Sequence, residues 1–79
     1  MNSTKRNLFP NPDEIKHLRS CIRTGTTVEL ISMKDRWTKL RPGDRGTVIF
    51  VDDAGQIHVN WDNGSSLALN VKLDSFSRI

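Results

Sequence analysis

Trp37 lies within residues 34–41 (KDRWTKLR), where an indole is surrounded by cationic side chains. An aromatic ring in such a setting can stack on a nucleic-acid base or a guanidinium while the cations hold phosphates. The candidate binding residues are Trp37, Lys34, Arg36, Lys39, Arg41 and Arg45. The alternative is that Trp37 folds back over the mouth of the barrel predicted below and the cations form a solvated loop.

Asp52 and Asp53 are adjacent carboxylates, a residue type that can bind a metal or act as acid and base. Neighbouring side chains at the end of a strand diverge, however, and Ala54-Gly55 follows as a turn signal. Asp is favoured at such turns because it forms hydrogen bonds with the local backbone. We therefore predict a structural role for both residues.

His17 and Cys21 are four residues apart in a predicted helix, a spacing that can place two metal ligands on one face. A structural zinc site needs four ligands, and only His58 remains as a further nitrogen ligand. Free Cys behaves as a small hydrophobe, so we expect Cys21 to border the apolar stripe beside Leu18 and Ile22.

The sequence contains no recognisable nucleophile–base pair, phosphate-binding loop or set of metal ligands. It therefore predicts no catalytic residues, no metal site and no cofactor. We expect a protein that is not an enzyme.

These candidates must be positioned by a helix that we predict over residues 11–25. Asn11 can cap it, Pro12 suits its first turn, and two acids follow where the helix dipole favours them. Its apolar stripe is formed by Ile15, Leu18 and Ile22, and a basic stripe by Lys16, Arg19 and Arg23. Gly25 is expected to end the helix. So short a helix must pack on the rest of the domain, and its basic stripe could extend the basic loop if it docks nearby.

Short apolar and β-branched runs follow Gly25 and are separated by turn signals, a pattern typical of strands. The predicted strands are residues 27–33, 47–52, 57–62, 65–69 and 76–79. The side chains expected to point inward are Val28, Leu30, Ile57, Val59, Trp61, Leu67 and Leu69.

Turn residues punctuate these strands. Pro42-Gly43-Asp44 predicts a turn, and Gly46 a bend or bulge at the entry to the second strand. Asn63-Gly64 favours a type I′ hairpin, in which both residues have positive φ. Residues 70–75 are expected to form one short turn.

A helix followed by five short strands, with a long loop after the first, describes a small SH3-like barrel. Closing the sheet removes exposed edges, which is economical in so short a chain. We thus predict a mainly β protein: a flexible arm over residues 1–10 and one domain over 11–79, with the helix in 11–25 and a five-stranded barrel in 26–79.

The runs VELISM, TKLRPGDRGTV, VDDAGQIHVNWDNGSSLAL and DSF resemble a family of small bacterial proteins classed as a domain of unknown function. The resemblance covers roughly residues 13–79. It implies an SH3-like barrel and a gene carried on phage, plasmid or conjugative elements, but no activity and no site. Members usually read Ile-Pro-Gly-X-Asp-X-Phe after the fourth strand, where this chain has residues 70–76 (NVKLDSF).

Size and charge narrow the function further. The chain has 79 residues and a net charge of +3, with +5 in residues 1–46 and −2 in residues 47–79. No apolar run approaches the roughly 18 residues of a membrane span. Cys21 is the only cysteine, so no internal disulfide can form, and a cytoplasmic location is expected.

We therefore expect a binding module that engages a protein partner, as an accessory factor of a mobile genetic element, with a monomer favoured. The alternative is a nucleic-acid-binding module that uses the basic loop and Trp37.

Overall fold

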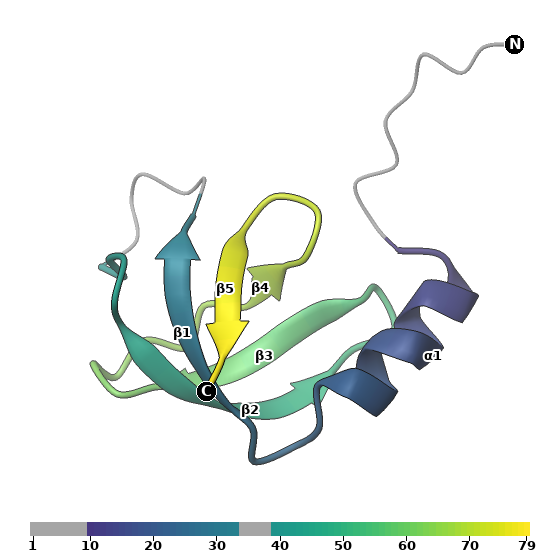
Figure 1. Cartoon of the computed structure of the whole chain (residues 1–79), viewed down its shortest axis with the longest axis horizontal. Coiled ribbons are helices and arrows are strands. Elements are labelled where there is room, and N and C mark those ends of the chain that lie inside the picture. The colour runs from purple at the N-terminus through teal and green to yellow at the C-terminus, as the bar shows by residue number, and fades with distance from the viewer. Residues whose placement is uncertain (1–9, 34–38) are drawn as a thin grey trace, which may run out of the picture.

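The structure, a computed structural model, describes residues 10–33 and 39–79. These described residues form one helix and five strands: α1 (Pro12–Cys21), β1 (Thr27–Ser32), β2 (Arg45–Val51), β3 (Gln56–Trp61), β4 (Leu69–Asn70) and β5 (Ser75–Arg78) (Figure 1). The predicted mainly β class with a short N-terminal helix is confirmed. The predicted arm, apart from Pro10, lies outside the described residues, as does the stretch 34–38.

All five strands belong to one antiparallel sheet with the order β4-β3-β2-β1-β5. Figure 1 shows β1 and β5 standing steeply across the β2–β3 ribbon, so the sheet is strongly bent. Within residues 10–33 and 39–79 no ladder joins β4 to β5. The sheet is therefore open, and the closed barrel that the sequence predicts is not seen as a continuous hydrogen-bonded ladder.

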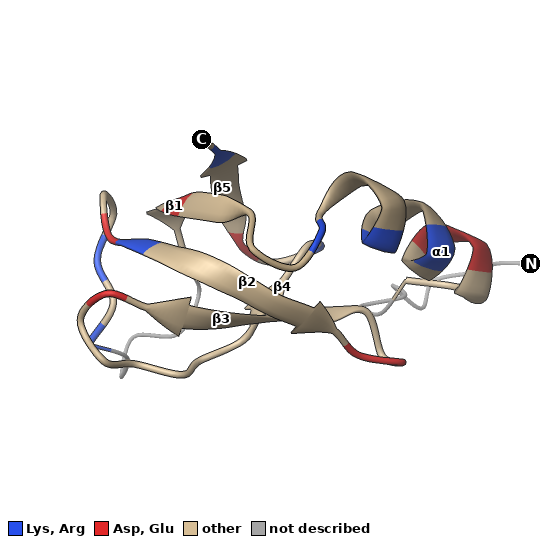
Figure 2. Cartoon of the chain, turned by 90° about the horizontal axis from the view of Figure 1, so that it is seen from below, with Lys and Arg blue, Asp and Glu red and all other residues tan. Residues whose placement is uncertain are grey.

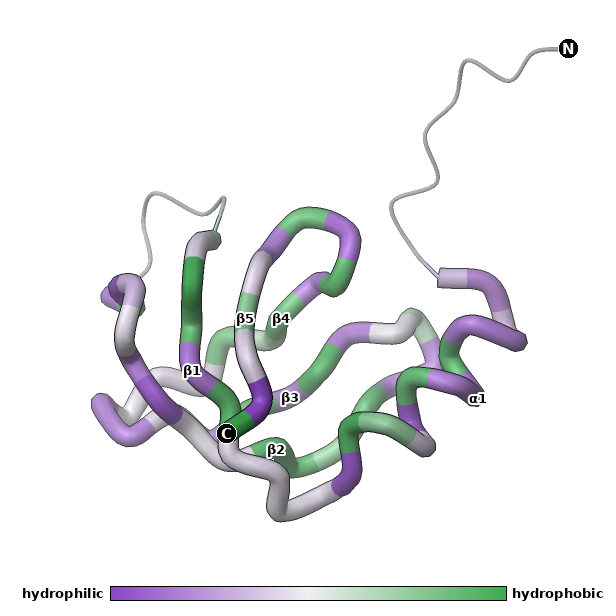
Figure 3. Tube along the Cα trace, viewed as in Figure 1, coloured by the Kyte–Doolittle hydropathy of each residue, from purple (hydrophilic) through white to green (hydrophobic). Residues whose placement is uncertain are grey.

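The core lies on the inner face of this sheet and follows the predicted alternation. Val28, Ile57 and Val59 are fully buried, and Trp61 is 2% exposed. The indole Nε1 of Trp61 donates to the carbonyl of Leu67 at 2.8 Å, so its polar atom is satisfied. Figure 3 shows hydrophobic residues recurring along β1, β2 and β3.

The fourth strand is much shorter than predicted. Only Leu69–Asn70 pair with β3, and Leu69 is buried while Leu67 is half-buried. We expected residues 65–69 to pair with the preceding strand through their backbone. The carbonyl of Leu67 instead accepts a hydrogen bond from the indole side chain of Trp61.

The predicted type I′ hairpin at Asn63-Gly64 is wrong. Only Gly64 has positive φ (89°), and its amide donates to the carbonyl of Trp61 at 2.9 Å. Ser65 then closes a three-residue loop, the common pattern of a turn followed by a left-handed glycine. Asn63 keeps negative φ, and its side chain accepts the Ser65 amide at 2.9 Å. The same pattern recurs over residues 52–56.

Gly46 is not the site of the bulge in β2. The register shifts between Val48 and Phe50, so the extra residue is Ile49. Gly46 is needed because a Cβ there would lie 2.5 Å from Cγ1 of Val59, across the ladder. The bulge leaves two consecutive residues, Ile49 and Phe50, on the exposed side of the strand.

Helix α1 begins as predicted and ends earlier than predicted. Asn11 accepts the amide of Glu14 at 2.8 Å, and Glu14 accepts the amide of Asn11 at 3.0 Å, which makes a full capping box. The last helical residue is Cys21, and Ile22 caps the helix. Gly25 (φ 92°) instead belongs to the turn that leads into β1, where its amide donates to the carbonyl of Val48.

The helix packs at one end of the β2–β3 ribbon. Ile15 is buried there, and Gly55 has no room for a side chain because a Cβ would lie 2.6 Å from Pro10 and 3.3 Å from Ile15. The linker after the helix follows β2: Val48 bonds to the linker backbone, and Thr24 Oγ1 donates to the carbonyl of Ile49 at 2.7 Å. Strand β2 is thus covered on its linker side as far as Ile49.

Replacing Gly46 by Ala should destabilise the domain by about 1–3 kcal/mol, because the new methyl group meets Val59 and the backbone of β3. Urea unfolding followed by circular dichroism would measure the loss. Thr47→Ala, on the exposed face of the same strand, is the control and should cost less than about 1 kcal/mol. Equal losses in the two variants would contradict the close approach at Gly46.

Candidate binding site

The predicted basic loop is only partly described. Trp37, Lys34 and Arg36 lie outside the described residues. Lys39 and Arg41 are exposed. Two acidic residues lie close to the cations of this loop. Oε1 of Glu29 lies 3.0 Å from Nε of Arg45, and Asp44 accepts the backbone amide of Arg41.

The basic stripe of the helix does not extend this loop. Arg45 begins β2, whereas Arg19 contacts Val51 at the other end of the same strand. Figure 2 shows basic residues at the start of the β2 ribbon and others on α1 and the linker that follows it, near the opposite end of that ribbon. Lys16 and Arg23 belong to the helix end, so the two groups of cations form separate surfaces.

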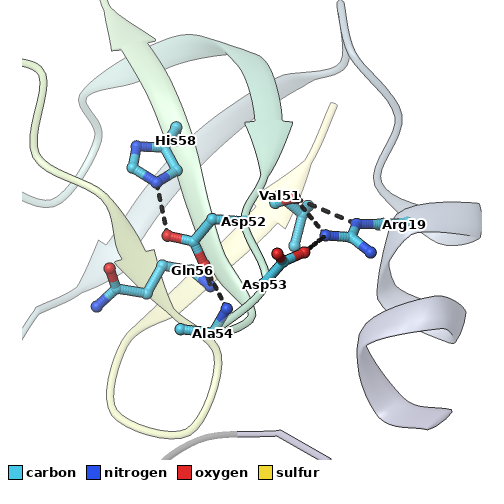
Figure 4. Close-up of polar contacts among 7 residues, drawn as sticks. All are labelled: Arg19, Val51, Asp52, Asp53, Ala54, Gln56 and His58. Carbon is cyan, nitrogen blue, oxygen red and sulfur yellow. Dashed lines mark hydrogen bonds and ion pairs between the residues drawn. The ribbon is translucent and has the colours of Figure 1, made fainter. Parts of the chain in front are cut away.

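Asp52 and Asp53 diverge, as predicted, and Figure 4 shows them pointing to different partners. Oδ1 of Asp52 accepts the amides of Ala54 and Gln56, both at 2.9 Å, and its Oδ2 lies 2.8 Å from Nε2 of His58. Burial alone would raise the pKa of Asp52, but the hydrogen bonds from His58, Gln56 and Ala54 outweigh it, and the pKa is lowered. Asp52 therefore holds the turn, whereas Asp53 pairs with Arg19 of the helix.

His58 in turn supports an exposed aromatic ring. The rings of His58 and Phe50 are stacked, with centroids 4.3 Å apart and an interplanar angle of 4°. Phe50 is 49% exposed and Ile49 is 48% exposed. We call Ile49, Phe50 and His58 the β2–β3 platform.

Sequence reasoning missed this platform, although the sequence contains a signal for it. Residues 48–51 (VIFV) are four apolar residues in a row, whereas a strand with one buried face can bury only alternate ones. Strict alternation would expose two of the four, Ile49 and Val51. The bulge at Ile49 exposes Phe50 in place of Val51.

A hollow of about 370 Å³ lies beside the platform, between β2 and the end of α1. Its lining residues are Arg19, Ile22, Arg23, Thr24, Phe50 and Val51. Arg19 forms one wall: its Nε and Nη2 donate to the carbonyl of Val51 at 3.2 and 3.1 Å, and Nη2 also lies 2.9 Å from Oδ1 of Asp53 (Figure 4). Arg23 is exposed at the rim.

A second hollow, of about 390 Å³, lies between α1 and the turn after β4. Leu18 and Val71 line it, but Glu14 and Lys72 on its rim already form an ion pair at 3.3 Å. Its exposed lining is more apolar than that of the hollow beside Phe50.

His17 and Cys21 lie on one face of α1, with Nε2 and Sγ 3.5 Å apart. Cys21 is exposed, so it does not act as a buried small hydrophobe. Ile22, which caps the helix, takes the buried position. No group of three or more possible metal ligands occurs within the described part of the chain.

The fold and the platform together define a small, mainly β domain with one open five-stranded antiparallel sheet and a short helix docked at one end. Residues 11–79 match the family model described as a domain of unknown function (DUF4314), and the chain belongs to this family. No curated protein and no solved structure gives a significant match. Among the described residues, no helix is long and apolar enough to cross a membrane.

Replacing Asp52 by Asn keeps an oxygen acceptor but removes the charge. Because the folded-state pKa of Asp52 is lowered from its ordinary value of 3.8, the carboxylate contributes stability above that value, and the contribution is lost as the pH falls through the folded-state pKa. Urea unfolding from about pH 6 to about pH 2 should show a smaller acid loss for the variant than for the wild type. Glu14, whose pKa is also lowered, by its bonds with Asn11 and Lys72, is common to both proteins. Parallel pH curves would contradict the role of Asp52.

Proposed function

We propose that the chain is a non-enzymatic binding module of the SH3-like small-barrel type that engages a protein partner through the β2–β3 platform. In this proposal it acts as a monomer in the cytoplasm, as an accessory factor of a mobile genetic element. The genomic setting rests on the family resemblance alone, and the cytoplasmic location on the single cysteine.

The path of the chain supports a barrel-like fold. The two edge strands of the open sheet, β4 and β5, are joined by only four residues, 71–74. This turn is tightly bonded: Asp74 accepts the amide of Asn70 at 2.9 Å and donates its own amide to the carbonyl of Asn70 at 2.8 Å. In a small barrel the two edge strands of the sheet lie close together, and a connection of four residues is short enough to join them there.

The observation that carries the binding function is the exposure of Phe50. Burying a phenylalanine side chain is worth about 1.5–3 kcal/mol, and aromatic residues are enriched where proteins meet. Phe50 is also held in place, since it stacks on His58, which Asp52 contacts. A rigid exposed ring loses little side-chain entropy when a partner covers it.

Phe50→Ser should abolish partner recovery in a pull-down from lysate of the host cell, because it removes the apolar anchor of the platform. We expect at least a tenfold loss of one specific protein, as is usual for an anchor worth more than about 1.4 kcal/mol. Asn60→Ala is the matched control, because Asn60 is exposed on the same face of β3 as His58. This variant should still recover the partner protein. Thermal melts should show both variants folded. Equal recovery by wild type and Phe50→Ser would remove the platform from the proposal.

The second candidate is a nucleic-acid-binding module that uses Trp37, Lys34, Arg36, Lys39, Arg41 and Arg45. The observation that favours it is the exposure of Lys39 and Arg41 beside the sheet. Glu29, Asp44 and Asp62 lie at the same end, however, which reduces the local positive charge. A polyanion binds mainly through several uncompensated cations.

Fluorescence anisotropy with single- and double-stranded DNA at low salt tests this candidate. If it holds, affinity falls steeply with salt, and Lys39→Ala with Arg41→Ala lowers the salt slope by about 2, close to one unit per lost phosphate contact. Trp37→Ala should weaken single-strand binding by loss of stacking. Flat titrations with both probes would exclude it.

A further inference from the structure

We propose that the hollow between α1 and β2 binds a protein segment in which a carboxylate side chain neighbours an apolar one, with Arg23 receiving the carboxylate and Phe50 the apolar group. This inference rests on the proposed function and specifies the chemistry of its partner.

Arg23 is the cation that is available for this role. It is exposed, and no described residue forms an ion pair with it. Its backbone is nevertheless fixed, because its carbonyl accepts the amide of Thr26 at 3.0 Å and Thr24 is tied to the carbonyl of Ile49. A guanidinium on an anchored backbone is well suited to a carboxylate, which it can bind with two parallel hydrogen bonds.

Arg19 shapes the hollow and is not its free charge. Its Nε and Nη2 are taken by Val51 and Asp53. Arg19 therefore lines the hollow as one half of an ion pair whose charges balance. Asp53, the other half, belongs to the β2–β3 turn, whereas Arg23 belongs to the linker after α1 (Figure 4 shows Arg19 with Asp53).

The rest of the hollow is apolar and has the size of a side chain or two. Ile22, Val51 and Phe50 line it, and its volume of about 370 Å³ falls at the lower end of the roughly 300–1,000 Å³ of ligand pockets. An apolar side chain of the partner would cover the exposed ring, while its carboxylate reaches the rim.

The local charges favour a single carboxylate over a nucleic acid. The end of the sheet where α1 packs carries three cations: Lys16, Arg19 and Arg23. Four acidic residues lie there too, on the helix and the β2–β3 turn: Asp13, Glu14, Asp52 and Asp53. Because Asp53 pairs with Arg19 and Glu14 with Lys72, Arg23 is the one uncompensated cation that lines the hollow, and the described residues around it form no row of cations for a phosphate backbone.

The test is a selection of random twelve-residue peptides displayed on phage against the full chain. If the inference is right, bound peptides are enriched in Asp or Glu next to Leu, Ile, Phe or Trp. Selection against Arg23→Glu should lose the acidic preference. Lys16→Ala is the charge-matched control for Arg23→Ala, since it removes one exposed cation of α1 outside the hollow.

The strongest peptide is then synthesised and its affinity measured by anisotropy. Arg23→Ala should weaken it about tenfold, as expected for a hydrogen-bonded charge, and Lys16→Ala should change it less than twofold. The same loss should follow from Glu→Gln or Asp→Asn in the peptide, and the two changes together should cost no more than either alone.

Other outcomes overturn the inference in distinguishable ways. Peptides that depend on Phe50 but not on Arg23 would leave the proposed function standing and refute the acidic partner. If the selection enriched no peptide motif, binding of a short segment with a carboxylate beside an apolar side chain would be refuted. The pull-down would still test the proposed function separately. Binding of a single-stranded poly(dT) probe that Arg23→Ala removes would show a polyanion site instead.

Discussion

The two hydrogen bonds from Arg19 to the carbonyl of Val51 decide how the helix sits on the sheet. The linker after α1 covers β2 only as far as Ile49, so the next carbonyl on that side would lack a strand partner. A buried carbonyl without a partner costs about 1–3 kcal/mol. The guanidinium supplies the missing donors, and with Ile15 buried against the β2–β3 turn it fixes the helix at this end.

This docking also decides which surface stays open. Helix α1 packs against the end of the β2–β3 ribbon and leaves its outer face uncovered, as Figure 2 shows. The bulge at Ile49 then places Phe50 on that face, beside Ile49. Both side chains are about half exposed, and the ring of Phe50 is held by its stack on His58.

Much of the fold could be predicted because its signals are local. The alternation of Ile57, Val59 and Trp61 with polar residues gave β3 and its buried face, and the capping residues gave the start of α1. The errors came from choices that local patterns leave open. The side chain of Asn63 stabilises its loop without positive φ, and the indole of Trp61 takes a carbonyl six residues away that we had assigned to a strand.

The candidate site was less predictable, because its parts meet only in the folded chain. Arg19 and Val51 are 32 residues apart, and their contact joins a helix to a strand end that no spacing rule connects. Asp52, which the sequence identified as a turn residue, proves to act also on His58, and through it on Phe50. The carboxylate of Asp52 therefore has two effects. It stabilises the turn of the β2–β3 hairpin, and it holds His58, on which the exposed ring of Phe50 stacks. A substitution that loosens the turn would loosen the platform, so the stability of the hairpin and the position of the exposed ring are physically coupled at this residue.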